Sequence, residues 1–177
     1  MENQGSLQAM STLTVAPARV DAVSPDYCLA RWNQFYIDIW RVHTTLAGIR
    51  TLGRCFDDFR RSFPEGVGLV TIVEPGAPLP PTEARQALGQ LLAEAAGSIR
   101  YSAVVYEGGG FRASAVRGVV SSLILLARPP FPHRVFATTT EACAWFQRSF
   151  GPEDVHGKEL ETAIADLRRR IAVRAFR

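Results

Sequence analysis

The chain has 177 residues, of which 47% are hydrophobic and 21% are charged, and its formal net charge is +3. This length and composition are typical of one globular domain with a buried core, and they argue against a disordered chain. Much of the excess positive charge lies in the C-terminal stretch DLRRRIAVRAFR, so the rest of the chain lacks the charge pattern of a nucleic-acid-binding domain.

The three cysteines, Cys28, Cys55 and Cys143, are widely spaced and have no CxxC pattern or histidine at ligand spacing. Their spacing argues against a disulfide framework and against a zinc site. No stretch reaches the ~18 uncharged apolar residues that a membrane-spanning helix needs. The N-terminus also lacks the basic and apolar segments of a secretory signal. We therefore expect a cytoplasmic protein with reduced thiols, no transmembrane segment, no metal and no cofactor.

Residues 1–26 are rich in Ser, Thr, Gln and Pro, and we predict a flexible N-terminal tail there. Two short strands, YCLARW and QFYIDIW, follow on either side of Asn33, and so short a connection predicts an antiparallel hairpin. Side chains alternate between the two faces of the second strand, which predicts a sheet with one drier side. One face carries Phe35, Ile37 and Ile39, and the other carries Tyr36, Asp38 and Trp40.

Helices and strands alternate through the rest of the chain. Thr44 or Thr45 is placed to cap a helix through TLAGIRTLGRCFDDFRRSF, and the apolar run VGLVTIVE predicts a central strand covered on both faces. The later elements, in order, are the helix TEARQALGQLLAEAAGSI, the strand YSAVVYE, an apolar helix over about 111–127, the strand HRVFAT and the helix TTEACAWFQRSF. Thr138, Thr139 or Thr140 is expected to cap this last helix, with Glu141 at capping-box distance from Thr138.

The stretch KELETAIADLRRRIAVRAF has apolar residues at helical spacing, so residues 151–177 are predicted to form a linker and an amphipathic C-terminal helix. Residues 27–150 then form the main domain. Its order of elements, ββαβαβαβα, predicts an α/β fold with a mixed, mostly parallel five-stranded sheet flanked by helices.

The segment HRVFATTTEACAWF closes the predicted domain with a recognisable pattern. The pattern consists of Arg134, Val135 and Phe136, a Thr-rich turn, then Glu141, Ala142 and Trp145. Together with the order of elements, it resembles the SpoIIAA-like family, a branch of the STAS fold related to the CRAL-TRIO lipid-carrier fold. The resemblance implies a STAS-like domain that regulates another protein by binding it, without catalysis. It also keeps open the alternative of a carrier or sensor of a small apolar or lipid-like ligand.

STAS domains that antagonise anti-sigma factors carry a phosphorylatable Ser or Thr, in an Asp-Ser-Ser-Gly type turn, at the start of the second helix. The matching stretch here reads VEPGAPLPPTEARQ, which lacks the Asp and the paired serines, and only Thr82 offers a hydroxyl at that helix N-terminus. A phosphate on Thr82 would meet the positive end of the helix dipole, so the resemblance makes Thr82 a candidate phospho-switch. The alternative interpretation is that Thr82 only caps the helix.

The glycine-rich turn EGGGFRASAVRG matches neither a dinucleotide-binding fingerprint nor a P-loop. It follows the carboxyl end of a predicted parallel strand, where open α/β sheets keep their ligand crevices. The candidate anion-binding residues of this turn are Gly109, Gly110, Arg112, Ser114 and Arg117. The alternative interpretation is that the glycines only make a sharp turn, for which their positive φ angles suit them.

The helix over residues 111–127 is apolar nearly all round, which predicts that it is covered on two sides. One cover is the sheet, and the other is the C-terminal helix, a second subunit or an apolar ligand. Candidate residues for a partner face are Phe111, Gly118, Ser122 and Leu125. The expected partners are therefore another protein, a second copy of this chain, or a small apolar ligand held between the sheet and this helix.

Glu74 and Glu107 each end a predicted central strand, and two carboxylates facing one crevice are able to perform acid–base chemistry. An enzyme that uses Glu74, Glu107 or Arg112 is therefore a third hypothesis, although glutamate at a strand end is commonly just exposed. The hypothesis that we favour is a non-enzymatic interaction domain without catalytic residues.

Overall fold

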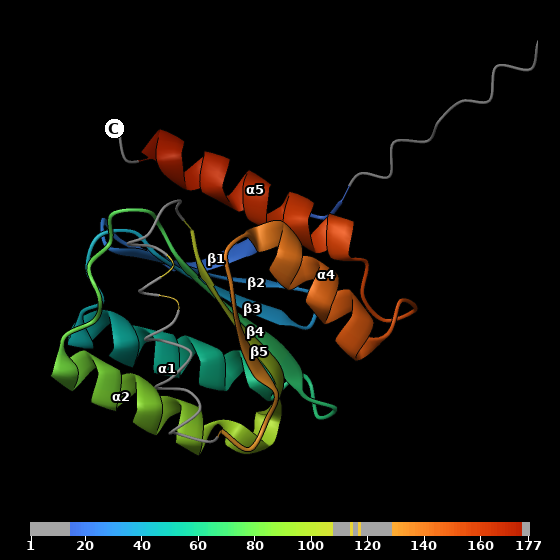
Figure 1. Ribbon diagram of the computed structural model, residues 1–177, viewed down its shortest axis with the longest axis horizontal. Coiled ribbons are helices and arrows are strands. Elements are labelled where there is room, and N and C mark those ends of the chain that lie inside the picture. The colour runs from blue at the N-terminus through green and yellow to red at the C-terminus, as the bar shows by residue number, and fades with distance from the viewer. Residues whose placement is uncertain (1–14, 108–113, 115–116, 118–128, 175–177) are drawn as a thin grey trace, which may run out of the picture.

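The computed structural model describes residues 15–107, 114, 117 and 129–174 (Figure 1). The strands are β1 (Arg19–Val23), β2 (Tyr27–Trp32), β3 (Phe35–Trp40), β4 (Val67–Val73), β5 (Ile99–Tyr106) and β6 (His133–Phe136). The helices are α1 (Leu46–Arg60), α2 (Thr82–Glu94), the short 3₁₀ helix η1 (Ala96–Ser98), α4 (Thr139–Phe150) and α5 (Gly157–Arg174). The predicted helix over residues 111–127 lies outside the described residues, except for Ser114 and Arg117, which both have helical backbone.

The strands form one sheet whose spatial order follows the chain order, from β1 to β6. The pairs β1–β2 and β2–β3 are antiparallel, whereas β3–β4, β4–β5 and β5–β6 are parallel. This topology confirms the predicted α/β class with a mixed, mostly parallel sheet. Because β3, β4 and β5 follow one another in a single direction, right-handed connections place α1 and α2 on the same face of the sheet.

The sheet has six strands, and the prediction of five was wrong. The additional strand is β1, which lies within the stretch predicted as a tail, so the described elements begin βββ instead of ββ. An ion pair between Asp21 and Arg31, with 2.9 Å between the charged atoms, joins β1 to β2. Just before β1, the Ala16 carbonyl accepts a hydrogen bond of 2.8 Å from the indole N–H of Trp32. These contacts hold a polar segment whose composition alone does not indicate a strand.

The strands β2 and β3 form the predicted antiparallel hairpin, with Tyr27 opposite Trp40 and Trp32 opposite Phe35. Asn33 in the turn has a φ of 46°, the left-handed conformation that two-residue hairpin turns require. All six residues of β3 are buried, so the expectation of one drier and one wetter face does not hold for this strand. Both of its faces are covered by helices.

One face of the sheet is covered by α1 and α2 (Figure 1). Thr45 is the N-cap of α1, since its hydroxyl accepts a hydrogen bond from the backbone N–H of Gly48, and this confirms one of the two predicted caps. The aromatic ring of Tyr36 in β3 packs against Phe56 and Phe59 of α1, with ring centroids 5.4 and 5.3 Å away. The helices therefore dock on the alternate residues of β3 that face them.

The opposite face is covered by α4 and α5 (Figure 1). Thr138 is the N-cap of α4 and accepts a hydrogen bond of 3.2 Å from the N–H of Glu141, which confirms this residue among the predicted caps. Trp145 is buried and packs edge-on against Tyr101 at 5.8 Å between ring centroids. The amphipathic stripe of α5 lies in the same core, and its buried residues include Leu160, Ile164, Leu167 and Ile171.

Gly68 in β4 lies so close to Phe35 that a Cβ at this position would be 2.4 Å from the phenyl ring. We expect Gly68→Ala to lower the free energy of unfolding by about 1–3 kcal/mol, because the ring and the backbone must shift to admit the methyl group. Urea unfolding followed by circular dichroism measures this change.

Gly89 provides the matched control, because a Cβ at this exposed position in α2 would have no other atom within 4 Å. We expect Gly89→Ala to raise the stability by up to about 1 kcal/mol, since alanine restricts the unfolded chain more than glycine does. Equal effects of the two substitutions would contradict the close contact between Gly68 and Phe35.

Candidate functional site

The carboxyl ends of β3, β4, β5 and β6 lie at one edge of the sheet, because these strands are parallel. The end of β1 lies there too, since two antiparallel pairings give β1 the direction of β3. We name this region the carboxyl edge and define it as residues 23–27, 40–46, 73–81, 106–107 and 136–140. Ligands of open α/β sheets bind outside the carboxyl ends of their strands, so a binding site is expected at this edge.

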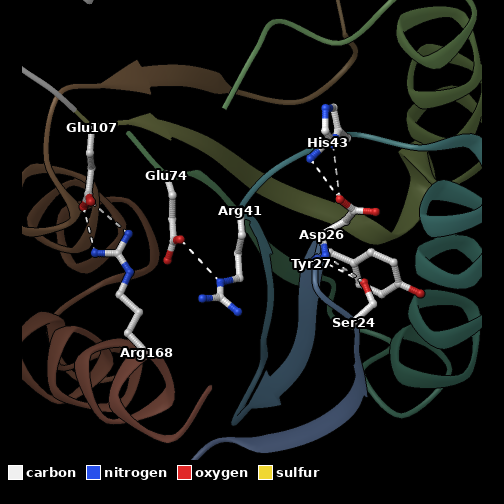
Figure 2. Close-up of polar contacts among 8 residues, drawn as sticks. All are labelled: Ser24, Asp26, Tyr27, Arg41, His43, Glu74, Glu107 and Arg168. Carbon is white, nitrogen blue, oxygen red and sulfur yellow. Dashed lines mark hydrogen bonds and ion pairs between the residues drawn. The ribbon is translucent and has the colours of Figure 1, made fainter. Parts of the chain in front are cut away.

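Arg41 and Glu74 follow β3 and β4 directly and form an ion pair across the carboxyl edge (Figure 2). The Nε of Arg41 lies 3.5 Å from Oε2 of Glu74, and both side chains are mostly buried. Their backbones are also fixed, since the N–H of Glu74 donates to the Trp40 carbonyl at 2.9 Å and that of Arg41 donates to the Asp26 carbonyl at 2.7 Å. The loops after β3 and β4 are therefore held together.

Glu107 follows β5 and is bound from two helices. Arg168 of α5 donates a hydrogen bond of 3.0 Å to one carboxylate oxygen of Glu107, and its second guanidinium nitrogen lies 3.0 Å from the other oxygen (Figure 2). The hydroxyl of Thr139, in the first turn of α4, also donates to Glu107, at 2.8 Å. The two-pronged pairing with Arg168 fixes geometry as well as charge, and together with the Thr139 bond it ties α5 and the start of α4 to the end of β5.

The structure brings Glu74 and Glu107 to the same edge, as the sequence predicts for two strand ends (Figure 2). Each carboxylate, however, faces its own guanidinium, Arg41 for the first and Arg168 for the second. This arrangement favours a role in positioning the chain over the exchange of protons between the two carboxylates. The enzymatic hypothesis stays a prediction, and its third residue, Arg112, lies outside the described residues.

Two of the candidate anion-binding residues, Ser114 and Arg117, are described, and both lie close to the carboxyl edge. Arg117 donates to the backbone carbonyl of Tyr106 at 3.2 Å and to the hydroxyl of Ser114 at 3.1 Å. The guanidinium thus binds the end of β5 itself. The other anion-binding candidates, Gly109, Gly110 and Arg112, and the partner-face candidates Phe111, Gly118, Ser122 and Leu125 lie outside the described residues, so both sites stay predictions.

Thr82 is exposed at the start of α2 but does not cap the helix. The N-cap is Pro81, which offers no side-chain hydrogen bond, so the interpretation of Thr82 as a cap was wrong. Proline fixes the chain in the extended conformation there and displaces Thr82 to the first helical position. The Thr82 hydroxyl instead accepts a hydrogen bond of 3.1 Å from the guanidinium of Arg85. Its phosphorylation stays a prediction.

Asp38 is a buried carboxylate in the middle of β3, with an exposed fraction of 1%. Its two oxygens accept hydrogen bonds from the indole N–H of Trp40, at 2.8 Å, and from the hydroxyl of Thr71, at 3.0 Å. Burial raises the pKa of Asp38 from the ordinary 3.8 to about 7, because the two hydrogen bonds, which act in the opposite direction, do not replace the lost hydration. Asp38 therefore holds a proton over a pH range where exposed aspartates have lost theirs.

Sequence reasoning did not identify Arg41, Arg168 or Asp38 as functional candidates. Arg168 lies in the basic C-terminal stretch DLRRRIAVRAFR, and its partner Glu107 is 61 residues away along the chain. For Arg41, the available signal was its position directly after a predicted strand. For Asp38, the available signal was a single acidic residue on the strand face that also carries Tyr36 and Trp40.

The carboxyl edge also carries exposed apolar side chains. Within the described part of the chain, the large hydrophobic residues that are exposed are Val23 at 43%, Val42 at 45%, Leu46 at 37% and Leu79 at 41%. All of them belong to this edge, at the end of β1, after β3, at the start of α1 and after β4 respectively. These four side chains therefore lie at the same edge of the sheet as the Arg41–Glu74 ion pair.

No family model, no curated protein and no solved structure matches this chain. Among the residues that the structure describes, no three His, Cys, Asp or Glu side chains are grouped so as to hold a metal ion. None of the described helices combines the length and the apolar character needed to cross a membrane.

The raised pKa of Asp38 predicts that its carboxyl group makes the protein less stable as the pH rises from about 4 to 7. In this range the Asp38 carboxyl group is ionised in the unfolded chain but still protonated in the folded protein, so the free energy of unfolding falls as the pH rises. Above pH 7, where Asp38 is ionised in both states, the total loss is about 1.4 kcal/mol for each unit by which the folded pKa exceeds the unfolded one. We expect Asp38→Asn to remove this dependence and to raise the free energy of unfolding at pH 8 by a few kcal/mol. Urea unfolding at pH 4.5 and at pH 8 measures the difference between the variant and the wild type.

The comparison with the wild type is essential, because burial lowers the pKa of His133 to about 4, and this group acts with the opposite sign over the same pH range. Asp58→Asn is the matched control, since the side chain of Asp58 is 72% exposed. We expect its stability to follow the wild type at both pH values. A variant Asp38→Asn that is less stable than the wild type at pH 8 would contradict the interpretation.

Proposed function

We propose that this protein is a non-enzymatic interaction domain that regulates a partner protein by binding it at the carboxyl edge of the sheet. The observation that carries the proposal is that the exposed large hydrophobic residues of the described chain, Val23, Val42, Leu46 and Leu79, all lie at this edge. Soluble domains seldom expose contiguous apolar patches rimmed by polar groups, and where they do, such patches commonly mark binding surfaces.

The surroundings of these side chains also suit an interface. Protein interfaces combine an apolar centre with a polar rim, and they are enriched in arginine. Val42 directly follows Arg41 in the chain, and the side chain of Arg41 pairs with Glu74, so a charged pair and exposed apolar residues occur at the same edge. The hydrogen bonds between the loops fix this surface before a partner arrives, which reduces the entropy lost on binding.

A STAS or SpoIIAA-like identity forms the second part of the proposal. In that family a strand leads into a capped helix whose Trp or Leu docks on the sheet. Here β6 leads into α4, Thr138 caps the helix, and Trp145 packs on Tyr101. These features support the proposal, and so does the exposure of Thr82, where a phosphate would lie beside the Arg85 guanidinium.

The test of the proposed interface is the substitution Val42→Asp, which places a charge among the exposed apolar side chains. We expect the purified wild-type protein to form a saturable complex, either with itself in sedimentation velocity or with one protein captured at fixed stoichiometry from a native extract. We expect Val42→Asp to weaken this complex at least about tenfold, because a buried, unpaired charge costs more than 1.4 kcal/mol.

Ala93→Asp is the control, because Ala93 is exposed near the end of α2, where the chain turns towards the start of β5 at the opposite end of the sheet. It introduces the same charge away from the carboxyl edge, and we expect it to leave the complex intact. Equal binding by the wild type and by Val42→Asp would rule out the carboxyl edge as the interaction surface.

A further inference from the structure

Three hydrogen-bonded side chains connect the buried core to an apolar pocket at the carboxyl edge. The pocket has a volume of about 120 Å³ and opens on the face of the sheet that α1 and α2 cover. Trp40 of β3 and Thr71 of β4 line it, and both are bonded to Asp38, which lies opposite Thr71 in the sheet and does not line the pocket itself. A change in the charge of Asp38 therefore acts directly on two residues of the pocket wall.

The two oxygens of the Asp38 carboxyl group have partners of different kinds. Oδ2 lies 2.8 Å from the indole nitrogen of Trp40, and Oδ1 lies 3.0 Å from the hydroxyl oxygen of Thr71. An indole N–H only donates, whereas a hydroxyl both donates and accepts. The ionised carboxylate accepts from both residues. The protonated carboxyl group has a proton to donate, and of these two partners only Thr71 is able to accept it.

The direction of the hydrogen bond between Asp38 and Thr71 therefore depends on the proton. When Asp38 is ionised, the hydroxyl of Thr71 uses its only proton in this bond. When Asp38 is protonated on Oδ1, the carboxyl group donates instead, and the proton of Thr71 is released for another bond. Because Thr71 lines the pocket, a hydroxyl donor becomes available at the wall that the ionised form does not offer.

The surroundings of Asp38 supply no cation that would keep it ionised. Among the described residues, the titratable groups on this side of the sheet in the neighbouring elements are Asp21 on β1, Tyr27 and Arg31 on β2, Tyr36 on β3 and Cys55 on α1. Arg31 is paired with Asp21 at 2.9 Å, and burial raises the pKa of Tyr36, so that its hydroxyl carries no charge at neutral pH. Strand β4 has no titratable side chain, and the charged side chains of α2 are exposed. Asp38 itself is 1% exposed, and this burial raises its pKa to about 7, so that it gains and loses its proton in the neutral range.

We propose that Asp38, Thr71 and Trp40 form a proton-controlled switch in the wall of the pocket, in which protonation of Asp38 reverses its hydrogen bond with Thr71. One proton passes between solvent and Oδ1 of Asp38, and no other bond than hydrogen bonds changes. Loss of this proton also strengthens the bond from Trp40, because hydrogen bonds to a charged acceptor are shorter and stronger. The wall is thus held more tightly and lacks the Thr71 donor in the ionised form. The switch does not depend on partner binding at the carboxyl edge.

The first test follows the carboxyl carbon of Asp38 and the indole N–H of Trp40 by NMR between about pH 5 and pH 9. The variants Asp38→Asn and Trp40→Phe identify the two signals. We expect both signals to titrate with one common midpoint. We expect Thr71→Val to raise this midpoint by about one pH unit, because the bond from Thr71 stabilises the ionised form more than the neutral one. Thr71→Ser keeps the hydroxyl and is expected to titrate as the wild type does.

Thr162→Val is the matched control, because it makes the same chemical change at an exposed position of α5, where the hydroxyl donates to the Lys158 carbonyl. We expect its midpoint to equal that of the wild type. The second test is neutron diffraction from wild-type crystals at about pH 5.5 and pH 8.5. We expect a hydrogen on Oδ1 of Asp38 at the lower pH, and the hydrogen of Thr71 directed at Asp38 at the higher pH.

The proposal is overturned if the carboxyl carbon of Asp38 does not titrate in this range, or if Thr71→Val leaves the midpoint unchanged. It is equally overturned if the hydrogen of Thr71 points at Asp38 at both pH values. Should Thr71→Val fail to fold, the neutron comparison of the wild type at the two pH values decides the question by itself.

Discussion

The fold depends on one strand, β3, being buried on both of its faces. This strand joins the antiparallel half of the sheet to the parallel half, and all six of its residues are buried. Phe35, Ile37 and Ile39 meet the core beneath α4 and α5, while Tyr36 and Trp40 meet the core beneath α1 and α2. Because the side chains alternate with a period of two, a shift of one residue in register would exchange both sets at once. The position of the carboxyl edge follows from this register.

Asp38 occupies a buried position on the face of β3 that packs beneath α1 and α2, where a hydrophobic side chain would be expected. Its retention costs free energy, since two hydrogen bonds from neutral donors do not replace full hydration. The two donors, Trp40 and Thr71, both line an apolar pocket of about 120 Å³ at the carboxyl edge, so their hydrogen bonds to Asp38 fix the orientation of two side chains in its wall. A buried polar group of this kind lowers the free energy of unfolding but holds neighbouring side chains in one orientation, and such groups are typical of binding sites.

The sequence correctly predicted the features that depend on residues close together in the chain. The hairpin around Asn33 and the caps at Thr45 and Thr138 depend on residues within four positions of each other, and they are found where the sequence places them. The strand β1 was missed because its partners come from β2, as the ion pair between Asp21 and Arg31 illustrates. The predicted strand ends placed Glu74 and Glu107 at one edge of the sheet. Their ion-pair partners, Arg41 and Arg168, are 33 and 61 residues away along the chain, so the residues next to each glutamate did not indicate them. Asp38 shares a strand face with Tyr36 and Trp40, and the period-two pattern of residues is the same whether that face is exposed or buried, so the burial of Asp38 could not be predicted from it.

The pairing of charges at the carboxyl edge determines what kind of partner suits it. Glu74 is neutralised by Arg41, and Glu107 by Arg168, so neither carboxylate contributes an uncompensated charge beside the exposed apolar side chains. A partner that buried this edge would not need to supply a matching charge, and it would gain free energy mainly from the apolar area removed from water. Since Arg168 comes from α5, the helix that ends the described chain takes part in fixing this surface, and any movement of α5 would unpair Glu107 beside it.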